Sequence, residues 1–151
     1  MNTTDFLGHW RIDRQIEDAV SGPAHAAGSA VIRELADHWE YRESVKIKIA
    51  SGQVFSGSRV YLWHPREDGF EVMFEDGRPF HRISFVAPDA RHWCDPDQYD
   101  VRYDFADWPI WSSRWVVKGP RKDYAMTTRY SPQPTQNAGE VAPGFEVQRL
   151  E

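Results

Sequence analysis

Apolar and polar residues alternate along several stretches of the chain with a period of two. The clearest stretch is 39–49, where the odd-numbered residues from Trp39 to Ile49 are mostly apolar and the even-numbered ones are polar. Alternation of this kind predicts a strand with one buried face. Comparable or weaker patterns predict further strands at 10–16, 26–35, 53–63, 70–74, 79–85, 91–95, 99–105, 111–117 and 124–130.

Glu43 lies on the apolar face of the strand at 39–49. Burying a lone carboxylate is costly, so Glu43 should have a cationic or hydrogen-bonding partner, or be protonated. The next strand offers two registers, because the turn at Ser51-Gly52 can have two or three residues. The shorter loop sends Val60 and Leu62 inward. The longer loop, with a bulge, sends Phe55, Arg59, Tyr61 and Trp63 inward, and it is favoured because it gives Glu43 a partner in Arg59.

Asp76-Gly77 is a strong signal for a two-residue hairpin loop. Pairing Glu75 with Arg78 places Val72 opposite His81, so that His81 points inward and Phe80 outward. In the following strand His92 and Cys94 point inward, and they share the face of His81 if the loop around Pro88 has an even number of residues. Trp93 then points outward, and with Phe80 it gives an exposed aromatic face that is a possible homodimer interface.

About ten antiparallel strands with short connections predict an all-β barrel or sandwich, and closure into a barrel removes exposed edges. Thr3, Thr4 and Asp5 predict a short helical turn before the first strand. We expect one domain over residues 1–130. Residues 131–151 lack periodicity and are rich in Pro, Gln, Asn, Gly and Ala, so an irregular C-terminal tail is expected.

Lipocalins and their calycin relatives open their first strand with Gly-x-Trp after a helical turn, and Gly8 and Trp10 resemble that opening. A longer pattern over residues 6–130 resembles an uncharacterised bacterial family of calycin-like domains. The resemblance implies a calycin-like β-barrel and carries no known activity. Fatty-acid-binding proteins and haem-binding nitrobindins are also ten-stranded calycins, but their ligand motifs do not match residue by residue. The pattern consists of Tyr41-x-Glu43, Arg59-x-Tyr61, Phe74-x-Asp76-Gly77-x-x-Phe80-His81, His92-x-Cys94 and Trp115-x-Val117-Lys118-Gly119-Pro120-x-Lys122-Asp123-Tyr124.

Composition narrows the function classes. A net charge of −5 argues against nucleic acid as the main partner. No apolar run is long enough to span a bilayer and no signal-peptide core is visible at the start, so we expect a cytoplasmic protein without a membrane partner. The single cysteine excludes an intrachain disulfide framework.

The inward-facing polar residues predict a pocket with a polar end among aromatic side chains, which suits a small, partly apolar ligand with a polar or anionic group. The ligand and any cofactor are not specified by the sequence. The candidate ligand-binding residues are Glu43, Arg59, Tyr61, His81, His92, Cys94, Tyr99, Trp115 and Tyr124.

Other interpretations of the same residues stay open. His81, His92 and Cys94 could hold zinc or copper, Cys94 could be a nucleophile activated by His81, and either histidine could ligate haem. An enzyme could use His81 as general acid or base, with Glu43 orienting it. Alternatively, the barrel is filled by its own side chains and has a structural or interaction role. An interior void lined by His81, Glu43 and Arg59 would favour binding or catalysis over the filled barrel.

Overall fold

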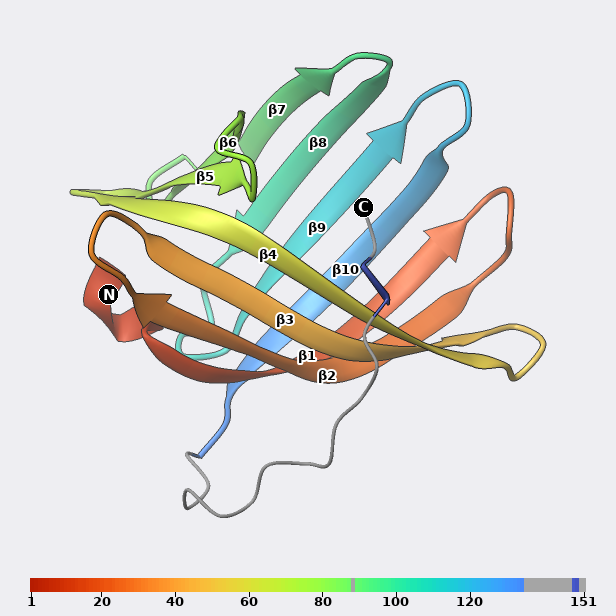
Figure 1. Ribbon diagram of the computed structural model, residues 1–151, viewed down its shortest axis with the longest axis horizontal. Helices are drawn as coiled ribbons and strands as arrows, with labels where there is room; N and C mark the ends of the chain where they lie inside the picture. The colour runs from red at the N-terminus through yellow and green to blue at the C-terminus, as the bar shows by residue number, and fades with distance from the viewer. Residues whose placement is uncertain (88, 135–147, 150–151) are drawn as a thin grey trace.

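The computed structural model describes residues 1–87, 89–134 and 148–149 and shows ten antiparallel strands in a nearly closed barrel (Figure 1). A single 3-10 turn precedes the first strand, so the all-β barrel and its N-terminal helical turn are confirmed. The elements are η1 (Thr3–Phe6), β1 (Gly8–Asp18), β2 (Ala24–Glu34), β3 (Trp39–Ile49), β4 (Val54–Arg66), β5 (Gly69–Phe74), β6 (Pro79–Ser84), β7 (Asp89–Cys94), β8 (Asp97–Asp104), β9 (Trp111–Lys118), β10 (Asp123–Pro132) and β11 (Gln148–Arg149).

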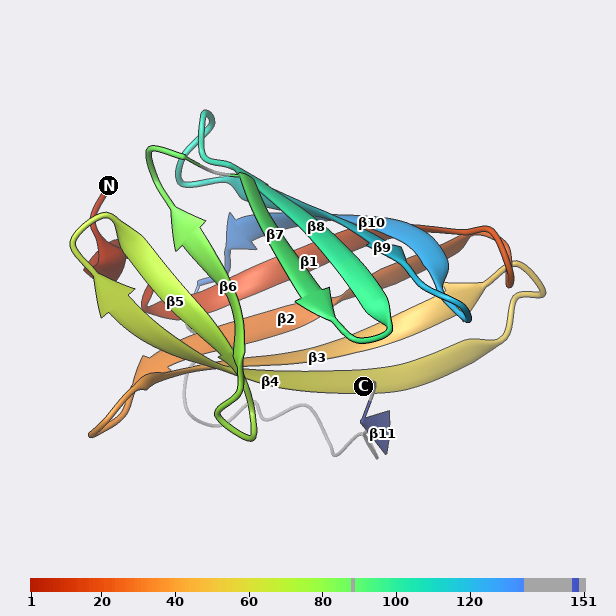
Figure 2. The same cartoon turned by 90° about the horizontal axis from the view of Figure 1, so that it is seen from above.

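The strands follow one continuous hydrogen-bonded path, β6-β5-β4-β3-β2-β1-β10-β9-β8-β7. Strands β6 and β7 are the two ends of this path, and no ladder joins them in the described part of the chain. Figure 2 shows these two strands side by side on one flank of the barrel. The short strand β11 lies off the path and pairs in parallel with Gly57 and Ser58 of β4. The barrel therefore has one seam, between β6 and β7.

An aromatic cluster fills the barrel beside η1. Phe6 is fully buried, and its ring centre lies 4.6 Å from that of Trp108 and 5.2 Å from that of Phe70. The indole Nε1 of Trp10 donates a hydrogen bond of 2.8 Å to the Phe6 carbonyl. At the other end, which we call the hairpin end, the loops β1–β2, β3–β4 and β9–β10 splay apart (Figure 1).

The β3–β4 register is the longer-loop alternative. The Ile49 amide donates to the Gln53 carbonyl (3.0 Å), and Gly52 has φ +89°, so the loop has three residues. Glu43 consequently lies opposite Arg59. This is the pairing that the favoured register predicts, so that register is confirmed.

The β5–β6 hairpin differs from the predicted hairpin in its loop length and in its ladder, and the two differences cancel at His81. Its loop has three residues, because the Phe74 amide donates to the Arg78 carbonyl (2.9 Å) and Gly77 takes φ +89°. An irregularity in the ladder then shifts the register by one, so that Val72 still pairs with His81. The inward direction of His81 is confirmed.

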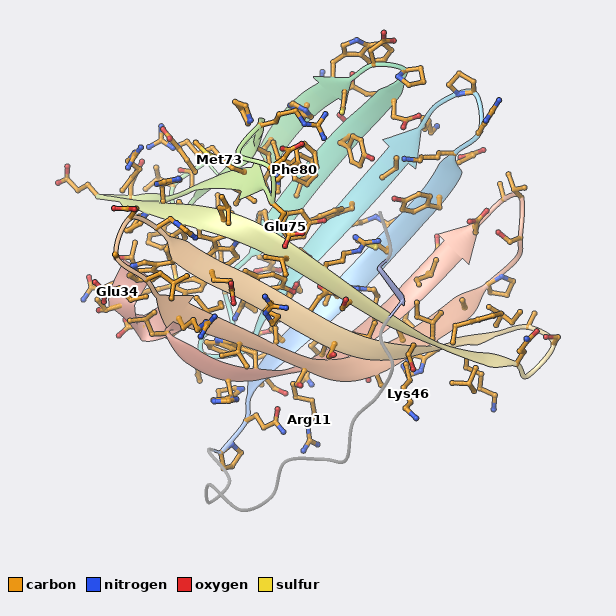
Figure 3. All side chains as sticks on the ribbon, in the orientation of Figure 1. Arg11, Glu34, Lys46, Met73, Glu75 and Phe80 are labelled. Carbon is orange, nitrogen blue, oxygen red and sulfur yellow. The ribbon has the colours of Figure 1, made fainter. Side chains whose placement is uncertain are left out.

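The predicted direction of Phe80 is wrong. The extra residue in the β6 ladder leaves Phe80 and His81 both buried, and Phe80 is only 3% exposed. Trp93 is 60% exposed, as expected. A shared aromatic face of Phe80 and Trp93 is therefore absent, and this basis for a homodimer interface is lost. On the outer surface, Arg11 and Lys46 point away from the barrel (Figure 3).

The predicted tail at 131–151 falls largely outside the described residues. Within it, β10 continues to Pro132 and residues 148–149 form β11. Across the described residues, no helix is long and apolar enough to cross a membrane.

Candidate ligand site in the barrel interior

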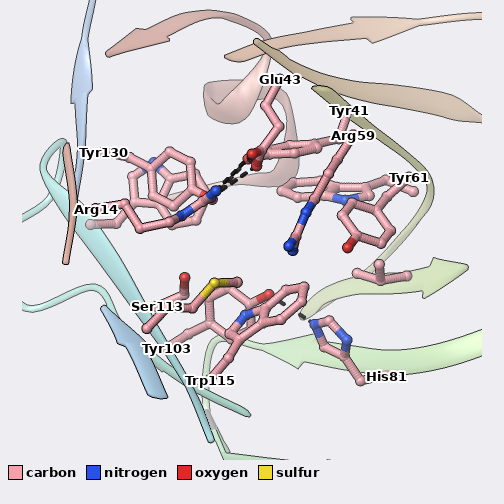
Figure 4. A pocket seen from close by; sticks show the side chains of 14 residues that line it. Arg14, Tyr41, Glu43, Arg59, Tyr61, His81, Tyr103, Ser113, Trp115 and Tyr130 are labelled. Atoms are coloured by element: carbon pink, nitrogen blue, oxygen red, sulfur yellow. Dashed lines mark hydrogen bonds and ion pairs between the residues drawn. The ribbon is translucent and has the colours of Figure 1, made fainter. Parts of the chain in front are cut away.

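A cavity lies inside the barrel between β1, β3 and β4 on one side and β6, β8 and β9 on the other (Figure 4). The space open to the centre of a water-sized sphere is about 20 Å³. About 10–15 Å³ of such space accommodates one water molecule, so the cavity has room for one or two waters as it stands. The polar residues around it include Arg14, Tyr41, Glu43, Arg59, Tyr61 and His81.

Arg14 and Glu43 form a buried ion pair on one wall of the cavity. Arg14 Nη1 donates to Glu43 Oε2 at 2.7 Å, and Arg14 Nη2 donates to Oε1 at 2.9 Å. The Tyr41 hydroxyl also donates to Oε1 (2.7 Å), and Arg14 Nε donates to the Thr128 hydroxyl (2.7 Å). Burial alone would raise the pKa of Glu43, but Arg14 overrides this and lowers the pKa to about 2. Glu43 is therefore ionised and fully partnered.

Arg59 projects into the middle of the cavity (Figure 4). It lies opposite Glu43 in the ladder, but it forms no ion pair among the described residues, so the predicted Glu43–Arg59 pair is wrong. Its Nε is buried and has no hydrogen-bond acceptor within residues 1–87, 89–134 and 148–149. The guanidinium carbon lies 5.8 Å from the ring centre of Trp115. The ring face attracts a cation, but it does not neutralise the charge.

His81 lies on the wall opposite the ion pair and is 9% exposed. Its Nε2 is 2.8 Å from the Tyr103 hydroxyl, whereas its Nδ1 is buried and none of the described residues hydrogen-bonds to it. Burial, followed by the nearby His92, lowers the pKa of His81 to about 3, so the ring is neutral near pH 7. The hypothesis that Glu43 orients His81 is wrong, because Tyr103 occupies the partner position.

The nine candidate residues separate into two groups. Those that line the cavity are Glu43, Arg59, Tyr61, His81 and Trp115; those that do not are His92, Cys94, Tyr99 and Tyr124.

Phe80 lies between the cavity and the seam. Its ring centre is 5.2 Å from that of Trp115, 5.3 Å from that of Tyr99 and 5.5 Å from that of His92. His92 and Cys94 are half-buried on β7 and alternate with exposed residues, which is the direction expected for them. Phe80 therefore stands between the cavity and both His92 and Tyr99.

Several cavity residues were not among the candidates, notably Arg14, Tyr103, Trp111, Ser113 and Tyr130. Arg14 carried a usable signal, because it is a charged residue on the otherwise apolar face of Trp10, Ile12 and Ile16. Glu43 was a candidate for the same reason, since it too is a charged residue on an apolar strand face. For Tyr103, Trp111 and Tyr130 the alternation predicted burial but gave no reason to separate cavity residues from ordinary core.

Four residues that line the cavity each have a buried nitrogen atom with no hydrogen-bond partner in the described part of the chain. They are Arg59 Nε, His81 Nδ1, Trp111 Nε1 and Trp115 Nε1. Buried polar atoms are nearly always hydrogen-bonded in native proteins, so a cluster of exceptions needs an explanation. Within the described ranges, no three or more His, Cys, Asp or Glu side chains form a group that could hold a metal ion.

Residues 6–132 match the sequence pattern of a family of unknown function, DUF6314. The chain belongs to this family. The match covers the barrel and agrees with the prediction of an uncharacterised family, while the bacterial part of that prediction stays a prediction.

No curated protein matches the DUF6314 chain in sequence. A solved structure that it resembles is the S-type phycobiliprotein lyase CPES from Guillardia theta, with a TM-score of 0.56 and 15% identity. The likeness covers 90% of this chain and 95% of the lyase chain. At this level of identity it shows a shared barrel fold and nothing more specific.

Proposed function

We propose that the barrel interior binds a small, partly apolar molecule that carries a polar or anionic group. The observation that carries this proposal is that four residues lining one cavity each have a buried nitrogen atom without a partner among the described residues. Ligand sites are typically apolar cavities with a few fixed polar groups, and aromatic rings supply most of the remaining wall here. A ligand that hydrogen-bonds these atoms would remove the cost of burying them unpaired.

The small volume of the cavity limits how much of a ligand can fit inside it. Space for one or two waters accommodates only the polar end of a ligand, so its apolar part has to lie beyond the cavity or displace side chains. Arg59 and Tyr61 are the candidates for such movement, because both are half-buried rather than fully enclosed. The similar barrel belongs to a protein named as a lyase, which supports a functional interior at the level of fold only.

Native mass spectrometry of the full chain, purified without added ligand, tests the proposal. We expect an adduct that survives gentle ionisation and is lost under denaturing conditions. Arg59→Gln should reduce the retained fraction, whereas Arg129→Gln, which changes an exposed arginine on β10, should not. A spectrum with no adduct, together with a crystal structure that has only waters on the four nitrogens, would contradict it.

The small cavity volume favours one second candidate, a filled barrel with a structural or interaction role. In that case one or two ordered waters satisfy the unpartnered nitrogens. The same mass spectra and crystal structure distinguish the two functions.

A further inference from the structure

The geometry points to a monoanionic amphiphile as the ligand, with its charged group against Arg59 and its apolar body directed along β4 towards the hairpin end. This inference rests on the proposed function and names the chemical class of its ligand. Charge, hydrogen-bonding capacity and the distribution of apolar surface each support one part of it.

The residues around the cavity carry one uncompensated positive charge. Arg14 and Glu43 neutralise each other in a two-point ion pair, and His81 is neutral. Arg59 is the remaining ionised side chain among the described lining residues, and it has no carboxylate partner. A buried charge without a partner is costly. One negative charge from a ligand would balance this interior, whereas two would leave an excess of the opposite sign.

Three of the four unpartnered nitrogen atoms of the lining residues are hydrogen-bond donors. The Arg59 Nε, Trp111 Nε1 and Trp115 Nε1 groups carry hydrogens and lack acceptors. The strongest acceptor nearby is Glu43, but both of its oxygens already accept hydrogen bonds from Arg14. An oxyanion fits these three donors, since it accepts several hydrogen bonds and donates none. An ammonium group would meet three donors, and the one unpartnered nitrogen able to accept from it is His81 Nδ1, in the tautomer that carries its hydrogen on Nε2.

The distribution of apolar residues favours one direction for the apolar body. Beside η1 the barrel is filled by the aromatic cluster around the fully buried Phe6. Towards the hairpin end, the inner face of β3 and β4 continues from Glu43 and Arg59 to the buried Val45, which lies opposite Gly57. Ile47 and Phe55 follow, also opposite each other. Ile47 is half-buried and Phe55 is 40% exposed, so apolar surface is available there.

The strand geometry limits the length of this body. Phe55 lies four positions before Arg59, which corresponds to about 13 Å along an extended strand. A ligand whose apolar part is much longer than this would project into solvent at the hairpin end. Eight-carbon chains fall within the limit, so they are suitable probes.

Isothermal titration calorimetry of the full chain with four eight-carbon probes tests the inference. The probes are octanoate, octan-1-ol, octylammonium and octanedioate, which differ in the number and sign of their charges. We expect octanoate to bind most tightly and octylammonium most weakly. Arg59→Gln should weaken octanoate binding by roughly 10- to 100-fold, the range for a lost hydrogen bond to a charged group, and leave octan-1-ol binding unchanged.

Two further variants control for poor folding of Arg59→Gln and for the loss of a positive charge as such. Arg59→Lys keeps the charge, so it should retain a preference for octanoate over octan-1-ol even if Arg59→Gln folds poorly. Arg129→Gln removes an exposed charge of the same sign and should change neither affinity.

Each of the other possible binding results would contradict one part of the inference. Equal affinity for octanoate and octan-1-ol, or equal losses for both in Arg59→Gln, would show that the ligand is not recognised by its charge, although interior binding would stand. Tighter binding of octanedioate than of octanoate would overturn the single-charge inference. If none of the four probes binds, the inference is wrong, and the proposed function then depends on the mass-spectrometric adduct alone.

Discussion

Arg14 on β1 binds both carboxylate oxygens of Glu43 on β3, although β2 lies between the two strands. The side chains meet above Ala26, Gly28 and Ala30, the small residues on the inner face of β2. Strands two positions apart are separated by about 10 Å, so only long side chains can bridge them, and only over a strand without bulk of its own. This contact leaves Arg59 without the carboxylate that faces it across the β3–β4 ladder.

Glu43→Gln should be strongly destabilising. The change removes the only carboxylate among the described cavity-lining residues and leaves two guanidinium groups buried together. Breaking a buried pair by removing one partner typically costs about 3–5 kcal/mol. Urea denaturation should show this as a lower midpoint with an unchanged slope. A loss below about 1 kcal/mol would mean that the ion pair is solvated in solution.

Arg59→Gln should have the opposite effect on the ligand-free protein. It removes an unpaired charge whose Nε is buried, while the amide keeps some hydrogen-bonding capacity. We expect the free energy of unfolding to rise by no more than about 1 kcal/mol. Burial lowers the pKa of Arg59, but the nearby Tyr61 and Glu43 raise it above its ordinary value, so they offset part of the cost of burying the charge. Arg129→Gln is the matched control and should change stability by less than about 0.5 kcal/mol. A marked loss of stability in Arg59→Gln would reveal a partner for Arg59.

Local sequence patterns predicted the strands and the inward direction of Glu43, Arg59 and His81, because alternation and turn chemistry act over a few residues. They did not predict which arginine pairs with Glu43, since that depends on the small residues of an intervening strand. The Phe80 error has a similar origin. A loop one residue longer and a compensating ladder irregularity leave the register at His81 unchanged, so the sequence around the turn fits both arrangements.

Phe80→Ala tests the corrected position of this residue. Its ring is stacked 4.5 Å from that of Phe74 and is almost fully buried, so its removal should cost about 3–5 kcal/mol. Trp93→Ala removes a larger but 60% exposed side chain and should cost much less. Thermal unfolding of the two variants measures the difference. Similar losses in both, or a greater loss for Trp93→Ala, would favour the two-residue hairpin that places Phe80 outside.

Gly28→Ala tests the close approach of β2 and β3 beneath the ion pair. A Cβ atom at this position would clash with the Ser44 carbonyl oxygen, which belongs to the backbone and cannot rotate away. Strand β2 must therefore shift, and overpacking of this kind costs about 1–3 kcal/mol. Urea denaturation measures the loss, with Ala27→Ser on the exposed side of the same strand as the control. Equal stability of the two variants would show that β2 and β3 are further apart in solution.

His81 should make the stability of the protein depend on pH below neutrality. Its pKa is about 3 in the folded state, against an ordinary value of 6.5. Between these values the unfolded chain binds a proton that the folded protein excludes, so the stabilisation is complete above pH 6.5 and is lost as the pH falls towards 3. His81→Gln keeps a polar group for Tyr103 but does not titrate. The difference in unfolding free energy between wild type and this variant should change by up to about 1.4 kcal/mol per pH unit between pH 6 and pH 4. Carboxylates titrate in both proteins, so they largely cancel in the difference. A difference that stays constant over this interval would mean that His81 is protonated or exposed in the folded state.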